Sequence, residues 1–160
     1  MNDITFKPIG IIHSPFREPS GTPIQTTAGE GVEGFVEIFP EYAEGLQDLG
    51  EYSHIILIYH FHLCTKFSLT LIPYLDTKPH GLFATRAPCR PNPIGLSIVR
   101  LLRIEQLKLF IRDVDILDGT PLLDLKPYVP EFDVKEVDKR GWLTNNVHRL
   151  RDMKADGLRE

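Results

Sequence analysis

The decisive stretch of the sequence is SIVRLLRIEQLKLFIRDVDIL at residues 97–117. Two apolar runs rich in Ile, Val, Leu and Phe flank Glu105-Gln106, which predicts a β-hairpin with strands at 97–104 and 108–117. Similar short runs, separated by Pro or Gly, predict further strands at residues 6–13, 34–38, 54–61 and 67–72. We therefore expect an all-β protein with few helices.

The segment between the second and third predicted strands has a helical pattern instead. Pro40 suits the first turn of a helix, and Tyr42, Leu46 and Leu49 fall on one face of it. We expect residues 40–49 to form one or two helical turns that cap one end of the sheet.

Thirteen prolines punctuate the chain, and several lie in residues 85–95 and 120–130. Aromatic and branched residues are interleaved with these prolines, which predicts long ordered loops rather than disorder. Loops of this kind on a rigid sheet commonly carry binding sites.

The composition changes after Asp133, where Lys, Arg, Asp and Glu predominate. We expect residues 1–133 to form one domain and residues 134–160 to form an appendage that packs on this domain or on a second subunit. Asn146 is a candidate cap for a short helix in the appendage, with apolar positions at Val147, Leu150 and Met153.

The bulk composition fits a globular protein without a membrane span. A chain of 160 residues with 42% hydrophobic and 25% charged residues can bury a real core. It has no run of about 18 apolar residues and no secretory signal at its start, so we expect a cytoplasmic protein. Cys64 and Cys89 are isolated and lack metal-ligand spacing, which predicts two reduced, packed thiols and no structural metal.

Charge is distributed unevenly along the chain. The net charge of −4 argues against a nucleic-acid partner, and residues 1–60 hold nine acidic residues against two basic ones. Residues 86–112 hold six basic residues against one acidic, a local charge of +5. This stretch is either a basic stripe for RNA or the solvated face of a hairpin. Strand alternation places Arg100 and Arg103 on opposite faces, so only part of the set can form one patch.

The most informative loop is FATRAPCRPNPIGLS at residues 83–97. Prolines restrict the backbone around Arg86 and Arg90, so their guanidinium groups are presented from a stiff loop, and Gly95 permits close backbone approach. This arrangement suits recognition of an anion or a carboxylate. The alternative is that the arginines bridge carbonyl groups within the loop.

A second informative stretch is DILDGTPLLDLKPY at residues 115–128. Asp-Gly-Thr-Pro is first of all a turn sequence, and a plain turn is the simpler interpretation. Asp118 and the amides beside it can also hold a ribose hydroxyl or an amino group, because a turn exposes unpaired backbone donors and acceptors.

Other common kinds of site find less support. His60 and His62 share one face of a predicted strand, yet no carboxylate or cysteine at ligand spacing completes a metal site. A metal-dependent hydrolase built on them is therefore a remote alternative. The sequence contains no G-x-S-x-G elbow, no Walker loop and no G-x-G-x-x-G turn.

Taken together, five segments resemble those of one family, the TrmO/TsaA-like (YaeB) proteins. Three of them are IGIIHSPF at 9–16, EIFPEYAEGL at 37–46 and YHFH at 59–62. The other two are the loop at 83–97 with Arg86 and Arg90, called the arginine loop below, and the turn at 117–120, called the Asp118 turn. The resemblance covers roughly residues 5–133. The combination of the arginine–proline loop with Leu-Asp-Gly-Thr-Pro makes it specific.

The resemblance implies a small single-sheet β-barrel with short helices, which forms a homodimer and binds S-adenosylmethionine without a Rossmann domain. Members of the family methylate N6 of threonylcarbamoyladenosine at position 37 of tRNA. Carried over by position, the cofactor contacts fall on Gln25, Thr26, Thr27, Phe61, His62, Arg86, Leu96, Leu117, Asp118, Gly119 and Thr120. The candidates for contact with the substrate are Arg90, Asn92 and Lys126.

The chemistry of methyl transfer agrees with this inventory. Arg86 can pair with the carboxylate of the cofactor, Leu96 and Leu117 can pack on its adenine, and Asp118 can accept a hydrogen bond from it. The reaction needs positioning rather than a metal or a covalent intermediate. A general base is either unnecessary or His62.

One position departs from the family pattern, which often has Pro-Arg-Gln where this chain has Pro23-Ile24-Gln25. The missing arginine and the acidic net charge favour an alternative function, a module that binds S-adenosylmethionine or a methyltransferase with a different substrate. The basic stretch 86–112 favours RNA.

Overall fold

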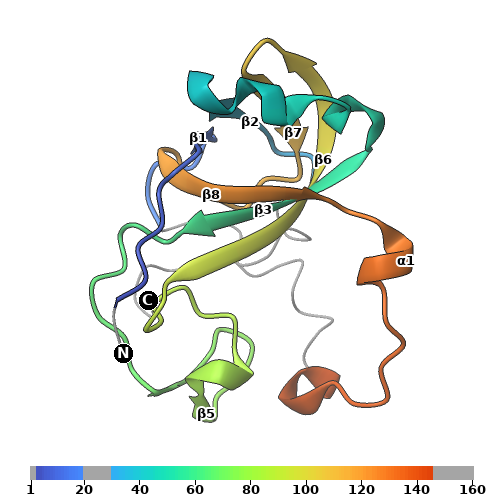
Figure 1. Cartoon of the computed structure of the whole chain (residues 1–160). Coiled ribbons are helices and arrows are strands. Elements are labelled where there is room, and N and C mark those ends of the chain that lie inside the picture. Colours follow the sequence, from blue (N-terminus) through green and yellow to red (C-terminus); the bar gives the residue numbers. More distant parts are fainter. Residues whose placement is uncertain (1–2, 20–29, 146–160) are drawn as a thin grey trace.

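Six antiparallel strands form a closed barrel in the computed structural model, which describes residues 3–19 and 30–145 (Figure 1). Around the barrel the strands follow the order β1-β2-β7-β6-β3-β8. Their bounds are β1 Gly10–His13, β2 Glu33–Ile38, β3 His54–His60, β6 Ile94–Glu105, β7 Lys108–Arg112 and β8 Thr120–Pro127. The expected all-β, single-sheet barrel is confirmed.

The core fills the barrel because its strands alternate inward and outward side chains. In β3, Ile55, Leu57 and Tyr59 are buried, and the residues between them are partly exposed. β6 shows the same alternation and pairs with β3 along the whole length of β3. A period of two is what a strand with one face on the core requires.

Two short 3₁₀ helices, η2 (Pro40–Leu46) and η3 (Leu49–Glu51), lie at one end of the barrel (Figure 1). Leu49 belongs to the buried core, and Leu46 packs against it. The expected helical cap on one end of the sheet is confirmed. Its helices are of the tighter 3₁₀ type, which is usual for pieces this short.

The strand that closes the barrel, β8, lies where the proline content predicted a loop. Its first four residues alternate between buried and partly exposed positions, and it pairs with β1 on one side and β3 on the other. The pairing partners override the local proline signal, because each neighbour supplies hydrogen bonds that a loop would have to find elsewhere. The prediction of a loop at 120–130 is therefore wrong.

The β6–β7 hairpin is present, but β6 begins three residues earlier than predicted, and β7 ends at Arg112 instead of at residue 117. Glu105 pairs with Lys108, so the turn lies at Gln106 and Leu107, one residue later than expected, and Gln106 has a left-handed φ of 55°. The register shifts between Leu101 and Arg103, which marks a β-bulge.

The bulge changes which way the arginines of β6 point. Arg100 pairs with Arg112 and Arg103 pairs with Phe110, whereas Leu101 faces the core. Leu102 is the extra residue, so Arg100 and Arg103 are both exposed on the outside of the barrel. The expectation that they lie on opposite faces is wrong.

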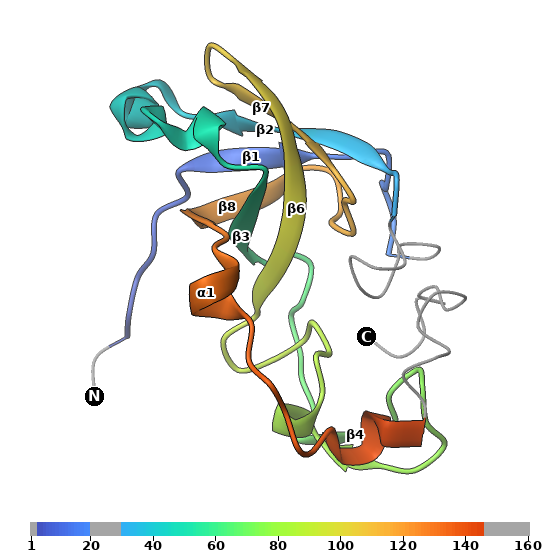
Figure 2. The ribbon, with the colours of Figure 1, turned by 90° about the vertical axis from the view of Figure 1, so that its right-hand side faces the viewer.

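The chain segment between β3 and β6 leaves the barrel and forms a separate lower lobe (Figures 1 and 2). It contains the two-stranded sheet of β4 (Thr70–Leu71) and β5 (His80–Gly81), followed by η4 (Leu82–Ala84). The predicted strand at 67–72 is thus reduced to two residues outside the barrel, because its partner β5 is equally short.

After β8 the chain forms α1 (Pro130–Asp133), and the described part of the appendage then runs to this lobe and ends in η5 (Gly141–Asn145) (Figure 2). The indole of Trp142 stacks on His80 with ring centroids 4.8 Å apart, and its Nε1 donates to the Ala84 carbonyl at 2.8 Å. The helix expected after Asn146 lies outside the described residues. No helix among the described residues is long and apolar enough to cross a bilayer.

Candidate functional site

The segments that carry the predicted site residues meet at one end of the barrel. There β3 ends and β6 begins, and the amide of Phe61 donates to the Pro93 carbonyl at 2.8 Å. β8 begins at the same end, since Tyr59 pairs with both Gly95 and Leu122. This geometry brings Phe61, His62, Leu96 and the turn at 117–120 to a common region.

A buried chain of hydrogen bonds links three of these segments. The Tyr59 hydroxyl lies 3.0 Å from Ser97 Oγ, and Ser97 donates to Asp115 Oδ1 at 2.7 Å. Because the only proton of Ser97 goes to the carboxylate, Tyr59 donates to Ser97. Burial, together with the nearby charge of Asp115, raises the pKa of Tyr59, so its hydroxyl stays protonated.

Gly95 allows this arrangement. A Cβ atom at this position would overlap the ring of Tyr59, so any larger residue would displace the tyrosine. The close backbone approach expected of Gly95 is therefore an approach to a core side chain. Tyr59 in turn meets the ring of Phe61 edge-on, with centroids 5.2 Å apart.

The arginine loop carries two arginines in different situations. Arg90 donates through Nη1 to the carbonyls of Thr85 at 3.1 Å and Ala87 at 3.2 Å. It thus bridges carbonyl groups of its own loop, as the alternative interpretation of this stretch proposed. Arg86 and Asn92 are exposed on the loop that Arg90 stabilises.

A disulfide joins Cys64, just after β3, to Cys89 in the arginine loop, with Cα atoms 5.1 Å apart. The prediction of two reduced thiols is wrong. A separation of 25 residues without a motif gives no sign of the pairing, whereas the fold places the two loops together because β3 ends where β6 begins. The bond ties the Phe61 and His62 segment to the loop of Arg86.

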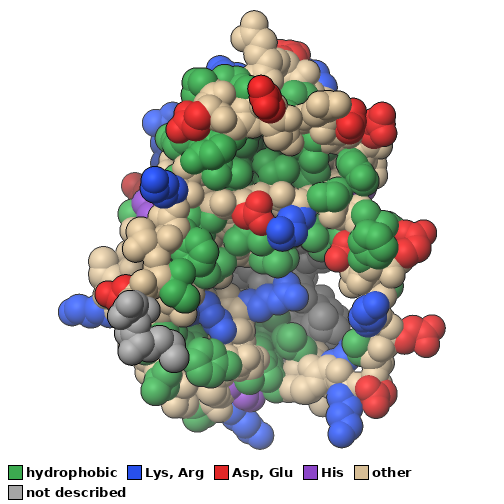
Figure 3. All heavy atoms as spheres, in the orientation of Figure 1, with side chains coloured by type: hydrophobic (Ala, Val, Ile, Leu, Met, Phe, Trp, Pro, Cys, Tyr) green, Lys and Arg blue, Asp and Glu red, His purple; other side chains and the backbone are tan. Residues whose placement is uncertain are grey.

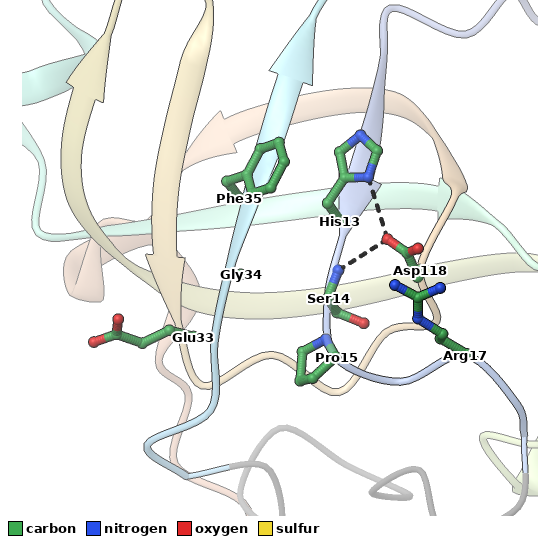
Figure 4. Close-up of a pocket in the computed structure, with 8 residues that line it drawn as sticks. All are labelled: His13, Ser14, Pro15, Arg17, Glu33, Gly34, Phe35 and Asp118. Atoms are coloured by element: carbon green, nitrogen blue, oxygen red, sulfur yellow. Dashed lines mark hydrogen bonds and ion pairs between the residues drawn. The ribbon is translucent and has the colours of Figure 1, made fainter.

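A pocket opens beside the Asp118 turn at the same end of the barrel (Figure 4). His13 Nδ1 lies 3.2 Å from Asp118 Oδ1, and the amide of Ser14 donates to the same oxygen at 3.3 Å. Residues from three separate segments line the pocket: His13, Ser14, Pro15, Arg17, Glu33, Gly34, Phe35 and Asp118.

Only Asp118 among these lining residues was a predicted site residue. The signal for His13 and Ser14 was present, because polar residues directly after an apolar strand commonly mark a functional strand end. Phe35 and Glu33 had no such signal, since they reach the pocket only through the pairing of β2 with β1.

The other residues of the Asp118 turn make contacts within the turn. Thr120 is buried and its Oγ1 donates to the Leu117 carbonyl at 2.8 Å, while Gly119 has a φ of 77°. The sequence at 118–121 therefore forms the predicted turn, and Asp118 projects from it.

One predicted residue, Lys126, lies away from this end of the barrel. Lys126 pairs with Ile56, near the opposite end of β3 from Phe61, and it forms an ion pair with Asp124 at 2.7 Å. Gln25, Thr26 and Thr27 lie outside the described residues. Across residues 3–19 and 30–145, no three His, Cys, Asp or Glu side chains gather where one metal ion could bind them.

Comparison with known proteins identifies the family. Residues 11–134 match the tRNA-methyltransferase O N-terminal domain, which is most of the barrel and the lobe. The chain belongs to the tRNA-methyltransferase O family. The family resemblance inferred from the sequence is confirmed.

The relatives of this family member include both binding proteins and an enzyme. A probable S-adenosyl-L-methionine-binding protein of Pyrococcus abyssi is 60% identical over 96% of this chain and 84% of its own length. A mouse tRNA (adenine(37)-N6)-methyltransferase is 32% identical over 94% of this chain. The chain spans only 36% of the mouse protein.

A crystal structure of TrmO from Pseudomonas aeruginosa has the same fold, with a TM-score of 0.73 and 36% identity. The match covers 90% of this chain and 64% of the solved chain. The family model and the mouse relative are named for methyl transfer to tRNA, and the Pyrococcus relative is named for binding S-adenosylmethionine.

Proposed function

We propose that this protein uses S-adenosylmethionine to methylate N6 of threonylcarbamoyladenosine at position 37 of tRNA. The observation that carries the proposal is the convergence of the segments around Phe61, Leu96 and Asp118 at one end of the barrel, beside a pocket. The family match and the name of the mouse relative support the reaction.

The side chains at this end of the barrel suit the proposed cofactor. S-adenosylmethionine carries a carboxylate, an ammonium group, ribose hydroxyls and an adenine, and its sulfonium supplies an electrophilic methyl group. Asp118 offers a carboxylate that His13 and Ser14 hold in place. Arg86 is an exposed residue of the arginine loop that can pair with a carboxylate, and Leu96 exposes 56% of its surface for apolar packing.

In this reaction the protein holds the cofactor and the adenosine in position and accepts the proton that N6 loses. A bond forms between N6 and the methyl carbon while the bond from that carbon to sulfur breaks, and N6 loses its proton. His62, half-buried just after β3, is the candidate base that accepts this proton. The disulfide and the Tyr59–Ser97–Asp115 bonds hold the surrounding segments in place, which favours catalysis through orientation.

A homodimer is part of the proposal. On β6, Ile94, Leu96 and Ile98 expose 39%, 56% and 37% of their surfaces on the outside of the barrel. Figure 3 shows apolar side chains gathered over one face of the barrel and a hollow, edged by Lys or Arg side chains, between barrel and lower lobe. Covering such a patch by a second copy would bury apolar surface next to Leu96. A monomer mass in light scattering at micromolar concentration would contradict the dimer.

The second candidate function is binding of S-adenosylmethionine without tRNA methylation, or methylation of another substrate. The net charge of −4 favours it, as does the name of the Pyrococcus relative. Ile24, the other observation in its favour, lies outside the described residues.

Methyl transfer can be tested directly. The protein is incubated with labelled S-adenosylmethionine and total tRNA from cells with or without the threonylcarbamoyl modification, and the RNA is digested to nucleosides. A labelled nucleoside found only with modified tRNA is the expected result. Label with both tRNAs would exclude threonylcarbamoyladenosine as the required substrate, and no label would support the binding module.

A further inference from the structure

A row of side chains crosses the outside of the barrel from β1 to β6. His13 pairs with Phe35, Phe35 with Phe110, and Phe110 with Arg103, so each side chain has its neighbour on the adjacent strand. We call His13, Phe35, Phe110 and Arg103 the aromatic row. Its last member is there only because the bulge at Leu102 turns Arg103 outward.

The members of the row are in contact throughout. The rings of His13 and Phe35 stack with centroids 4.5 Å apart, and those of Phe35 and Phe110 lie 6.1 Å apart. The guanidinium of Arg103 sits 3.7 Å from the centroid of Phe110, and Lys108 Nζ lies 5.2 Å from that of Phe35. The row is therefore one continuous surface of π systems and cations.

The barrel core does not explain this row. Val36, Leu109 and Ile111, which alternate with the row on β2 and β7, fill the interior and are fully buried. The rings of Phe35 and Phe110 lie on the other face of the same strands and remain partly exposed. Cross-strand pairing of aromatic rings stabilises sheets. Such pairing does not require the cations found here, Arg103 over Phe110 and Lys108 over Phe35.

Charged residues lie within the row and beside it. Four basic residues, Arg100, Arg103, Lys108 and Arg112, stand against three acidic ones, Glu33, Glu37 and Glu105. Arg112 pairs with Glu33 at 2.7 Å and Arg103 with Glu105 at 2.6 Å, and all four side chains are about half exposed. Ion pairs this exposed contribute little, so a phosphate can replace the carboxylate partner.

The row begins at the proposed site. His13 and Phe35 both line the pocket beside Asp118, and Figure 4 shows their rings side by side at its edge. A polymer with one unit in the pocket can therefore place its neighbouring units over the row. Aromatic rings and arginine planes interleaved with basic side chains are the surface that unpaired nucleobases and their phosphates recognise.

We propose that the aromatic row binds unpaired RNA next to the modified nucleotide. Bases pack on the exposed rings and on the Arg103 guanidinium, and phosphates approach Arg103, Lys108 and Arg112. This inference rests on the proposed function, because it assigns the RNA strand that enters the pocket to one face of the barrel.

The test uses the full-length protein and a fluorescently labelled anticodon stem-loop RNA. Phe110→Ala and Arg103→Ala change the row outside the pocket, and Phe132→Ala and Arg140→Ala make the same substitutions at exposed residues outside the row. Each row variant should weaken RNA binding about tenfold in fluorescence anisotropy, whereas the controls should bind like the wild type. Arg103→Ala should also flatten the slope of log affinity against log salt by about 0.7.

Two further measurements separate this inference from folding and from the proposed function. Calorimetry with S-adenosylhomocysteine should give the same affinity for every variant, and KM for tRNA should rise in the row variants while kcat stays constant. RNA affinity equal to the wild type in both row variants would overturn the inference, and a change of native mass alone would indicate an interface between copies instead. If the wild type binds RNA through the row yet transfers no methyl group, the proposed function fails and the inference stands.

Discussion

Replacing Ser97 by Ala removes the central link of the Tyr59–Ser97–Asp115 chain. Tyr59 is 4% exposed, so its hydroxyl would lose its partner in a place that water does not reach easily. An unsatisfied buried hydroxyl costs about 1–3 kcal/mol. Asp115 would lose a donor too, but it is only half-buried, so water can replace most of that bond. We expect the free energy of unfolding to fall by about 2–3 kcal/mol.

The assay is urea unfolding without reductant, followed by Trp or Tyr fluorescence, on four proteins: wild type, Ser97→Ala, Tyr59→Phe and the double variant. Tyr59→Phe leaves the bond from Ser97 to Asp115 intact and should cost only about 1 kcal/mol. The double variant has no stranded hydroxyl, so its loss should be smaller than the sum of the single losses by about 1 kcal/mol. A loss below about 0.5 kcal/mol for Ser97→Ala, or strict additivity in the cycle, would refute the reasoning.

Three other predictions concern the cofactor, the disulfide and pH. Arg86→Ala should weaken S-adenosylhomocysteine binding in calorimetry by about 1.5–3 kcal/mol, with Arg140→Ala unchanged; equal affinities would remove Arg86 from the site. Cys64→Ser should lower stability by about 3 kcal/mol, because the disulfide closes a separation of 25 residues, and added reductant should then change nothing further in urea unfolding. The hydrogen bond from His80 lowers the pKa of Asp76. The ionised Asp76 side chain therefore stabilises the fold fully above the ordinary pKa of Asp, and this stabilisation is lost as the pH falls through the lowered pKa. The difference in thermal stability between wild type and Asp76→Asn should therefore shrink below about pH 4; a constant difference would contradict this contribution.

Local sequence determined much of the fold and of the chemical class. The alternation of β3, the hairpin of β6 with β7 and the cap formed by η2 and η3 depend on consecutive residues, and they appear in the structure close to their predicted positions. The family was likewise recognisable from short segments, because each segment consists of consecutive residues whose types and spacing do not depend on the fold.

The tertiary structure alone decided how distant segments meet. His13 and Asp118 contact each other across a separation of 105 residues, and no local pattern records that pairing. The same holds for β8 as the closing strand, for the disulfide of Cys64 with Cys89, and for the outward turn of Arg103 at the bulge. Each depends on which strand lies beside which once the barrel closes, and closure is a balance over all six strands rather than a property of any one of them.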